Sequence, residues 1–261
     1  MLFTTLTTSV LLFAASATAA ALPPGPPPPP SPLGPPAPPT PREPIYTPAG
    51  NLENLSKLFP ESDLTSPSDL DLKYVVLGIG TQNYTCANDD AETVPGTTGA
   101  YATLYDIGTS LNTDRLAAWK LSSLSALALS LAEWAPGLVD MSLRSQGYEH
   151  ITGHHFFAPV AGVNTPTFSF DHLASPFPMT QVAKLGAVDA PSSACPGRNG
   201  LPAVPWLFLQ HQSGQGVAEG GIDTVYRVET AGGNRPASCE GMPERWEVKY
   251  AAQYWVYGPK Q

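Results

Sequence analysis

Basic residues are scarce in this sequence. Lysine and arginine together number 13 against 22 aspartates and glutamates, which gives a formal net charge of −9 at pH 7. An acidic surface repels the phosphates of nucleic acids and the anionic headgroups of membranes. We therefore expect no nucleic-acid partner.

Long hydrophobic runs are also lacking. No stretch beyond the N-terminus approaches the roughly 20 apolar residues that cross a bilayer, so no membrane span is expected. The apolar stretch at residues 10–15 is itself too short, and an A-x-A motif, Ala17-Thr18-Ala19, follows it. This pattern is typical of a secretory signal peptide. We expect residues 1–20 to be cleaved off and the mature protein to be secreted and extracellular.

Proline dominates the next segment, residues 22–48, and residues 26–30 are an unbroken proline run. Proline has no backbone N–H and favours the extended polyproline II conformation, so such a segment does not join a packed core. We expect residues 21–49 to form a disordered, proline-rich spacer. The remaining residues, 50–261, suffice for one domain with a sizeable core.

Cysteine occurs only at Cys86, Cys195 and Cys239, and never with the C-x-x-C spacing of many zinc sites. In an oxidising compartment three cysteines allow one disulfide and one free thiol, with three possible pairings. Cys195 and Cys239 both lie in loops rich in glycine, proline and serine, and we take them as the preferred pair. The sequons at Asn54 (N-L-S) and Asn83 (N-Y-T) predict N-glycosylation of a secreted chain.

Short apolar or alternating segments separated by turn residues indicate a mainly β protein. The predicted strands are residues 73–79, 100–105, 167–170, 182–188, 206–209, 224–229 and 246–257. We expect a β-sandwich or a barrel-like single domain.

One segment departs from this pattern and predicts an amphipathic helical insertion at residues 114–134. Large apolar side chains recur there every three to five positions, as on one helix face. They are Leu116, Trp119, Leu124, Leu127, Leu131 and Trp134. Thr113 or Asp114 is placed to cap the helix, and Pro136-Gly137 to end it.

One motif resembles part of a dinucleotide-binding fingerprint. Gly78-Ile79-Gly80 follows an apolar strand, but Asn83 stands at the third glycine position and turn-forming residues follow instead of a helix. Without a helix N-terminus there is no dipole and no set of free amides to hold a pyrophosphate. We interpret the glycines as a turn at the strand end and expect no nucleotide or other cofactor.

Histidines are the main candidates for a reactive site. Strand alternation would place His150 and His154 on one face and His155 on the other. With His211 from a neighbouring strand, His150 and His154 would offer three imidazoles to a metal ion. No H-E-x-x-H spacing is present, and the simpler interpretation is packed or exposed histidines without a metal. For a hydrolytic or metal-dependent enzyme, the candidate catalytic residues are His154, His155, His211 and Asp189.

Aromatic residues gather near the C-terminus. On a strand, Trp246, Tyr250 and Tyr254 share one face, whereas Trp255 and Tyr257 take the other. An exposed aromatic row would stack on sugar rings, but terminal strands often close a β core, and we expect these side chains to be core.

Seven sequence blocks occur in the order found in one protein family. They are LGIGTQNYTC (77–86), GAYATLYD (99–106), GHHFF (153–157), GAVDAP (186–191), VPWLFL (204–209), VYRVETAGGNRPASC (225–239) and KYAAQYWVYG (249–258). In these blocks the chain resembles a widespread family of fungal secreted proteins of unknown function, some of which carry a malate-dehydrogenase label. The likeness covers residues 74–258, implies secretion, and brings no established catalytic residues with it.

Secretion, the spacer, the acidic β-rich domain and the lack of catalytic motifs favour a non-catalytic module. Its expected partner is a cell-wall polysaccharide or another extracellular surface. The alternative is a secreted hydrolase or metal-dependent enzyme that uses the histidine-rich strand, although the G-x-S-x-G elbow of serine hydrolases is incomplete around Ser213. A malate-dehydrogenase-like oxidoreductase is disfavoured, because the alternating strands and helices of a doubly wound sheet are absent.

Overall fold

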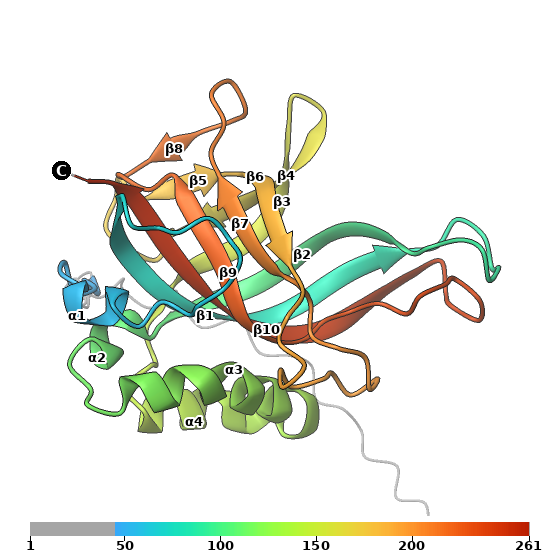
Figure 1. The fold of residues 1–261 in the computed structure, drawn as a ribbon, viewed down its shortest axis with the longest axis horizontal. Coiled ribbons are helices and arrows are strands. Elements are labelled where there is room, and N and C mark those ends of the chain that lie inside the picture. Colours follow the sequence, from blue (N-terminus) through green and yellow to red (C-terminus); the bar gives the residue numbers. More distant parts are fainter. Residues whose placement is uncertain (1–44, 261) are drawn as a thin grey trace, which may run out of the picture. The chain divides into compact units, whose positions relative to one another are not determined.

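The computed structural model describes residues 45–260. The predicted signal peptide (1–20) and residues 21–44 of the predicted spacer lie outside the described residues. The described strands are β1 (Leu70–Thr85), β2 (Gly96–Asp106), β3 (Ile151–Val160), β4 (Val163–Ser169), β5 (Met179–Gln181), β6 (Ala183–Val188), β7 (Trp206–Gln210), β8 (Ala218–Glu219), β9 (Thr224–Gly232) and β10 (Arg245–Pro259). The helices are α1 (Glu53–Ser56), α2 (Gly108–Leu111), α3 (Ala117–Trp134), the 3₁₀ turn η1 (Pro136–Leu138) and α4 (Val139–Ser145) (Figure 1).

The strands form one antiparallel sheet in the order β6-β7-β9-β10-β1-β2-β3-β4-β5-β8. β5 and β6 stand near opposite ends of this order, yet only Val182 separates them along the chain. The backbone N–H of Val182 donates to the carbonyl of Pro166 (3.0 Å), and Nδ1 of His211 donates to the carbonyl of Gln181 (3.0 Å). These contacts draw the two ends of the sheet together. The sheet therefore curls into a barrel-like body, which confirms the mainly β fold and selects the barrel-like form over the sandwich.

The central strands β1 and β10 are buried on both faces. On the inner face of the curled sheet, Val76 and Tyr254 pack with Phe168. On the outer face, Leu77 and Trp255 pack against the layer that holds α3, which runs along one side of the sheet (Figure 1). The predicted core position of the C-terminal aromatics is confirmed for four of the five, whereas Trp246 is only half-buried. The fully or nearly fully buried members are Tyr250, Tyr254, Trp255 and Tyr257.

The glycines of the Gly78-Ile79-Gly80 motif do not form a turn, so that prediction is wrong. Both lie inside β1, which continues without interruption to Thr85. A Cβ on Gly80 would overlap the carbonyl oxygen of Tyr101 in β2, and one on Gly78 would lie 2.5 Å from the Tyr254 ring. The glycines thus permit close packing of strand on strand and of strand on ring.

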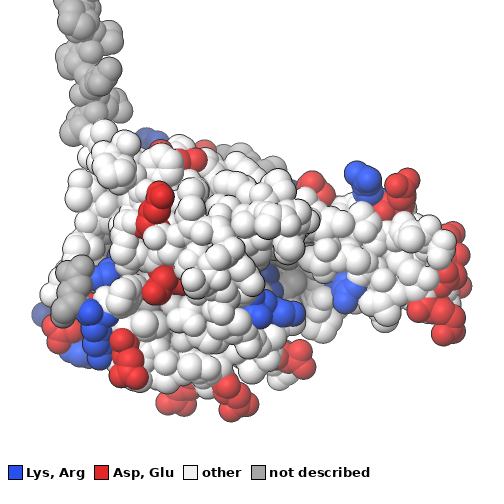
Figure 2. Space-filling model, turned by 90° about the horizontal axis from the view of Figure 1, so that it is seen from above, with Lys and Arg blue, Asp and Glu red and all other residues white. Residues whose placement is uncertain are grey.

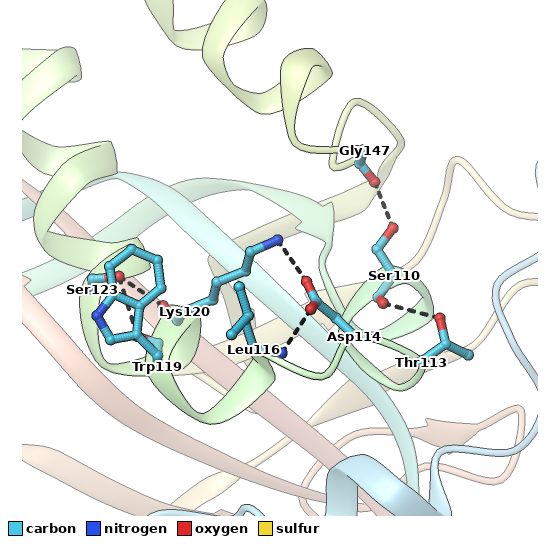
Figure 3. Close-up of polar contacts among 8 residues, drawn as sticks. All are labelled: Ser110, Thr113, Asp114, Leu116, Trp119, Lys120, Ser123 and Gly147. Carbon is cyan, nitrogen blue, oxygen red and sulfur yellow. Dashed lines mark hydrogen bonds and ion pairs between the residues drawn. The ribbon is translucent and has the colours of Figure 1, made fainter.

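The predicted helical insertion is present between β2 and β3, and it contains α2, η1 and α4 besides α3. α3 begins at Ala117, three residues after Asp114, and ends at Trp134 as predicted. Asp114 does not cap the helix itself. Its carboxylate accepts from the N–H of Leu116 (2.8 Å) and pairs with Nζ of Lys120 (2.6 Å), which holds the turn before α3 (Figure 3).

The buried face of α3 differs from the predicted one. The buried stripe consists of Ala117, Leu121, Leu124, Ser125, Ala128 and Leu129. Trp119 and Trp134 are each 68% exposed instead, and Leu116 is 59% exposed. Small residues such as Ala117 and Ala128 let the helix lie close to the sheet, and the two tryptophans are left outside. Within residues 45–260, no helix combines the length and apolarity needed to cross a membrane.

The predicted Cys195–Cys239 disulfide is wrong, because the structure pairs Cys86 with Cys239. β1 pairs with β10 as far as Thr85 opposite Arg245, so the loops after β1 and before β10 lie side by side. Cys195 is a half-buried free thiol in another loop. The disulfide joins the loop between β1 and β2 to the loop between β9 and β10. These loops end a projecting arm of the molecule, and acidic side chains gather at the tip of that arm (Figure 2). The acidic residues of these two loops are Asp89, Asp90, Glu92, Glu240 and Glu244.

Candidate functional site

Three side chains with metal-binding groups meet on the outside of the sheet. His154 belongs to β3, and Asp171 and His172 follow β4 closely. Nδ1 of His154 lies 3.2 Å from Oδ1 and 3.5 Å from Oδ2 of Asp171. The rings of His154 and His172 meet edge to face with centroids 5.2 Å apart, and ligand atoms of all three residues lie within 4.8 Å of one another. We call these three residues the His–Asp–His cluster.

The β3–β4 hairpin sets this arrangement. His154 pairs with Ser169, so Asp171 and His172 continue past it on the neighbouring segment. The backbone N–H of His172 donates to the carbonyl of Thr152 (3.1 Å), which holds this segment beside β3. The half-exposed ring of Tyr101, from β2, stacks on His154 with centroids 5.7 Å apart. The cluster therefore has one aromatic wall and a side open to solvent.

The other histidines of the predicted metal set lie elsewhere. His150 stacks on Tyr46 with ring centroids 3.8 Å apart, and His211 is bonded to the backbone of Gln181. Among residues 45–260, the His–Asp–His cluster is the one group of three or more such side chains whose ligand atoms come this close. Of the predicted metal set, His154 belongs to the cluster. Its neighbours there are Asp171 and His172 instead of His150 and His211.

The predicted catalytic residues have separate surroundings. His155 faces the inside of the curled sheet, where its Nδ1 donates to the carbonyl of Thr167 (2.9 Å) and its ring stacks on Phe168. Burial lowers the pKa of His155 to about 4, so this imidazole is neutral at pH 7. His154 lies on the opposite face, and Asp189 is exposed in the loop after β6.

A groove of about 620 Å³ runs beside the base of the disulfide-linked arm. Its apolar lining consists of Leu201, Pro236, Met242, Trp246 and Val248, and its polar lining of Glu133, Arg198, Asn199, Glu247 and Lys249. Trp246 is half-buried, and its ring packs on Tyr84 with centroids 5.6 Å apart. The guanidinium of Arg198 lies 4.4 Å from the ring centroid of Trp134, at the end of α3. We call this hollow the Trp246 groove.

A smaller cavity of about 220 Å³ lies between α3 and the sheet, next to a β-bulge. Glu229 lines it with a backbone φ of 47°, a conformation that non-glycine residues seldom adopt. Burial raises the pKa of Glu229. The hydroxyl of Ser125 and the indole N–H of Trp206 border the same cavity and have no hydrogen-bond partner among residues 45–260.

A family model described as "Protein of unknown function (DUF3455)" matches residues 67–258. The chain belongs to this family. No curated protein matches the chain, and no solved structure matches it either. The DUF3455 segment contains the His–Asp–His cluster, the Trp246 groove and the Glu229 cavity. A larger hollow of about 730 Å³ is lined in good part by residues 50–66, which precede the DUF3455 segment.

Proposed function

We propose that this protein is a secreted, non-catalytic fungal module that binds a neutral polysaccharide of a cell wall or a comparable extracellular surface in the Trp246 groove. The observation that carries the proposal is a half-exposed indole ring in a hollow that is lined by both apolar and polar side chains. Flat aromatic rings stack on the C–H faces of sugars, as they do on other apolar surfaces. The other C-terminal aromatics are core, so Trp246 is the member of that row that remains available to a ligand.

The charges around the groove favour a neutral ligand. Glu133 and Glu247 carry negative charge, and Arg198 and Lys249 carry positive charge, so the lining has no net charge. These groups supply both donors and acceptors for hydroxyl groups. The two glutamates would repel a polyanion, and Arg198 and Lys249 would repel a polycation. A neutral chain of hydroxyl groups would meet neither repulsion.

The disulfide supports the extracellular part of the proposal. Structural disulfides persist in oxidising compartments, and Cys86–Cys239 braces the arm beside the groove. Asn54 is exposed in α1 and is the more accessible of the two proposed glycosylation sites, because Asn83 lies within β1 between two paired strands.

The proposal is tested by sedimentation of the purified, natively secreted protein with insoluble chitin, β-glucan and cellulose. We expect retention on at least one of these polymers. Trp246→Ala should weaken this binding about tenfold, since stacking on a ring contributes about 0.5–1.5 kcal/mol beyond the area that it buries. Trp246→Phe should retain most of the affinity, because it keeps an aromatic face.

A matched control is Trp119→Ala, because Trp119 is 68% exposed on α3 and does not line the groove. This variant should bind like the wild type. The midpoint of thermal unfolding should be measured for every variant, since Trp246 also packs on Tyr84. Failure of the wild type to bind any of the polymers, or equal losses in the two alanine variants, would reject the proposal.

A further inference from the structure

The donor set of the His–Asp–His cluster is that of a transition-metal site. Two imidazoles and one carboxylate are ligands that zinc-class ions accept, and three protein ligands leave a coordination position for water or a further ligand. His154 comes from β3, while Asp171 and His172 come from the segment after β4, so paired strands fix the backbone positions of the set.

The distances also suit a bound ion. Two ligands that each lie about 2.1 Å from a tetrahedral zinc ion are separated by about 3.4 Å. The His154 Nδ1 to Asp171 Oδ1 distance of 3.2 Å is already of this size. His172 needs a closer approach, since the set spans up to 4.8 Å. Its side chain is exposed, and rotation about its χ angles can bring a ring nitrogen to the ion without a change in the backbone.

The surroundings separate this cluster from an ordinary surface ion pair. The side chain of His154 is only 23% exposed and that of Asp171 is 38% exposed, so both groups are partly withdrawn from water. The ring of Tyr101 covers one face of His154. A simple His–Asp pair would not account for the second imidazole, that of His172, whose ligand atom lies within 4.8 Å of the other two.

We propose that His154, Asp171 and His172 bind one divalent transition-metal ion of the zinc class, with an open coordination position toward solvent. This site shares no residue with the Trp246 groove, so the inference does not depend on polysaccharide binding. Neutral imidazole is the form that ligates, so the affinity should fall in acid, where histidines take up protons.

The test is equilibrium dialysis of the chelator-treated, natively secreted protein against micromolar ZnCl₂ at pH 7.5, with metal content measured by mass spectrometry. We expect about one equivalent of zinc and a higher midpoint of thermal unfolding in its presence. Asp171→Asn and His172→Ala should each lower the zinc affinity at least tenfold. Both replaced residues are exposed, so the variants should fold, which circular dichroism will verify.

His150→Ala and His211→Ala are the matched controls, because these histidines lie outside the cluster. Both should bind zinc like the wild type. Occupancy below about a tenth of an equivalent in the wild type would overturn the proposal. So would an equal loss of affinity in the control variants, since binding would then depend on scattered surface histidines.

Discussion

Removal of the Cys86–Cys239 disulfide should cost a large share of the stability of this protein. The bridge closes a chain segment with a sequence separation of 153. In the loop-entropy model, closing a loop of this length destabilises the unfolded chain by about 5 kcal/mol. The double variant Cys86→Ala/Cys239→Ala should therefore lose about 3–5 kcal/mol of unfolding free energy, because strain and residual structure lower the ideal value. That loss is comparable to the whole stability of many domains, which is about 5–15 kcal/mol.

The assay is urea unfolding followed by tryptophan fluorescence at pH 7.5. Cys195→Ser is the control and should change the free energy by less than about 0.5 kcal/mol, because this half-exposed thiol bridges nothing. A thiol titration of the unreduced protein in denaturant should find one thiol in the wild type and none in Cys195→Ser. If Cys195→Ser instead exposes a second reactive thiol, or if the double variant is as stable as the wild type, the assigned pairing or its energetic role is wrong.

Two further predictions concern the interior of the sheet. Gly80→Ala should destabilise the protein by 3 kcal/mol or more on an order-of-magnitude basis, because the new Cβ would overlap the Tyr101 carbonyl. Gly137→Ala, with nothing within 4 Å of its Cβ, is the control in the same urea assay, and similar losses in both would contradict the packing argument. Burial lowers the pKa of His155 to about 4 in the folded protein, whereas the imidazole of the unfolded chain has a pKa of about 6.5. Between these two pH values the unfolded state binds a proton that the folded state does not bind. Stability should be full above about pH 6.5 and fall by about 2 kcal/mol at pH 5. The drop should shrink in His155→Gln, and an unchanged pH dependence in that variant would refute the assignment.

Strand positions were predictable here because alternation and turn residues mark them locally. The segment at 73–79, for example, lies inside β1. The buried face of α3 was not predictable from periodicity, because large apolar residues occur around much of the helix. Close approach to the sheet selects Ala117 and Ala128 for the inside and leaves Trp119 outside. Disulfide pairing is unpredictable for a different reason, since it follows from the pairing of β1 with β10, which no local signal encodes.

The composition of the His–Asp–His cluster depends on a single turn, the one between β3 and β4. The sequence marks His154 as a candidate ligand, but its partners depend on the register of the β3–β4 hairpin. Ala161 and Gly162 both have positive φ, as in the two-residue turns that match strand twist, and Val160 pairs with Val163. Alanine is uncommon at such a position, so this hairpin carries no strong sequence signal. Once the turn is known, the register places Asp171 and His172 beside β3.

The filled interior of the sheet explains why the proposed binding sites lie outside it. Tyr250 and Tyr254 are fully buried and bonded to each other through their hydroxyls (2.8 Å), and Phe168 packs against Tyr254. A ligand inside the sheet would have to displace such rings, and each buried aromatic side chain stabilises the fold by about 1.5–3 kcal/mol. Side chains that do not pack in the core occur at strand ends and on the part of the outer face that the helices leave uncovered. Neighbouring positions in β3 show this division, because His155 is held neutral in the core while His154 presents its imidazole beside Asp171.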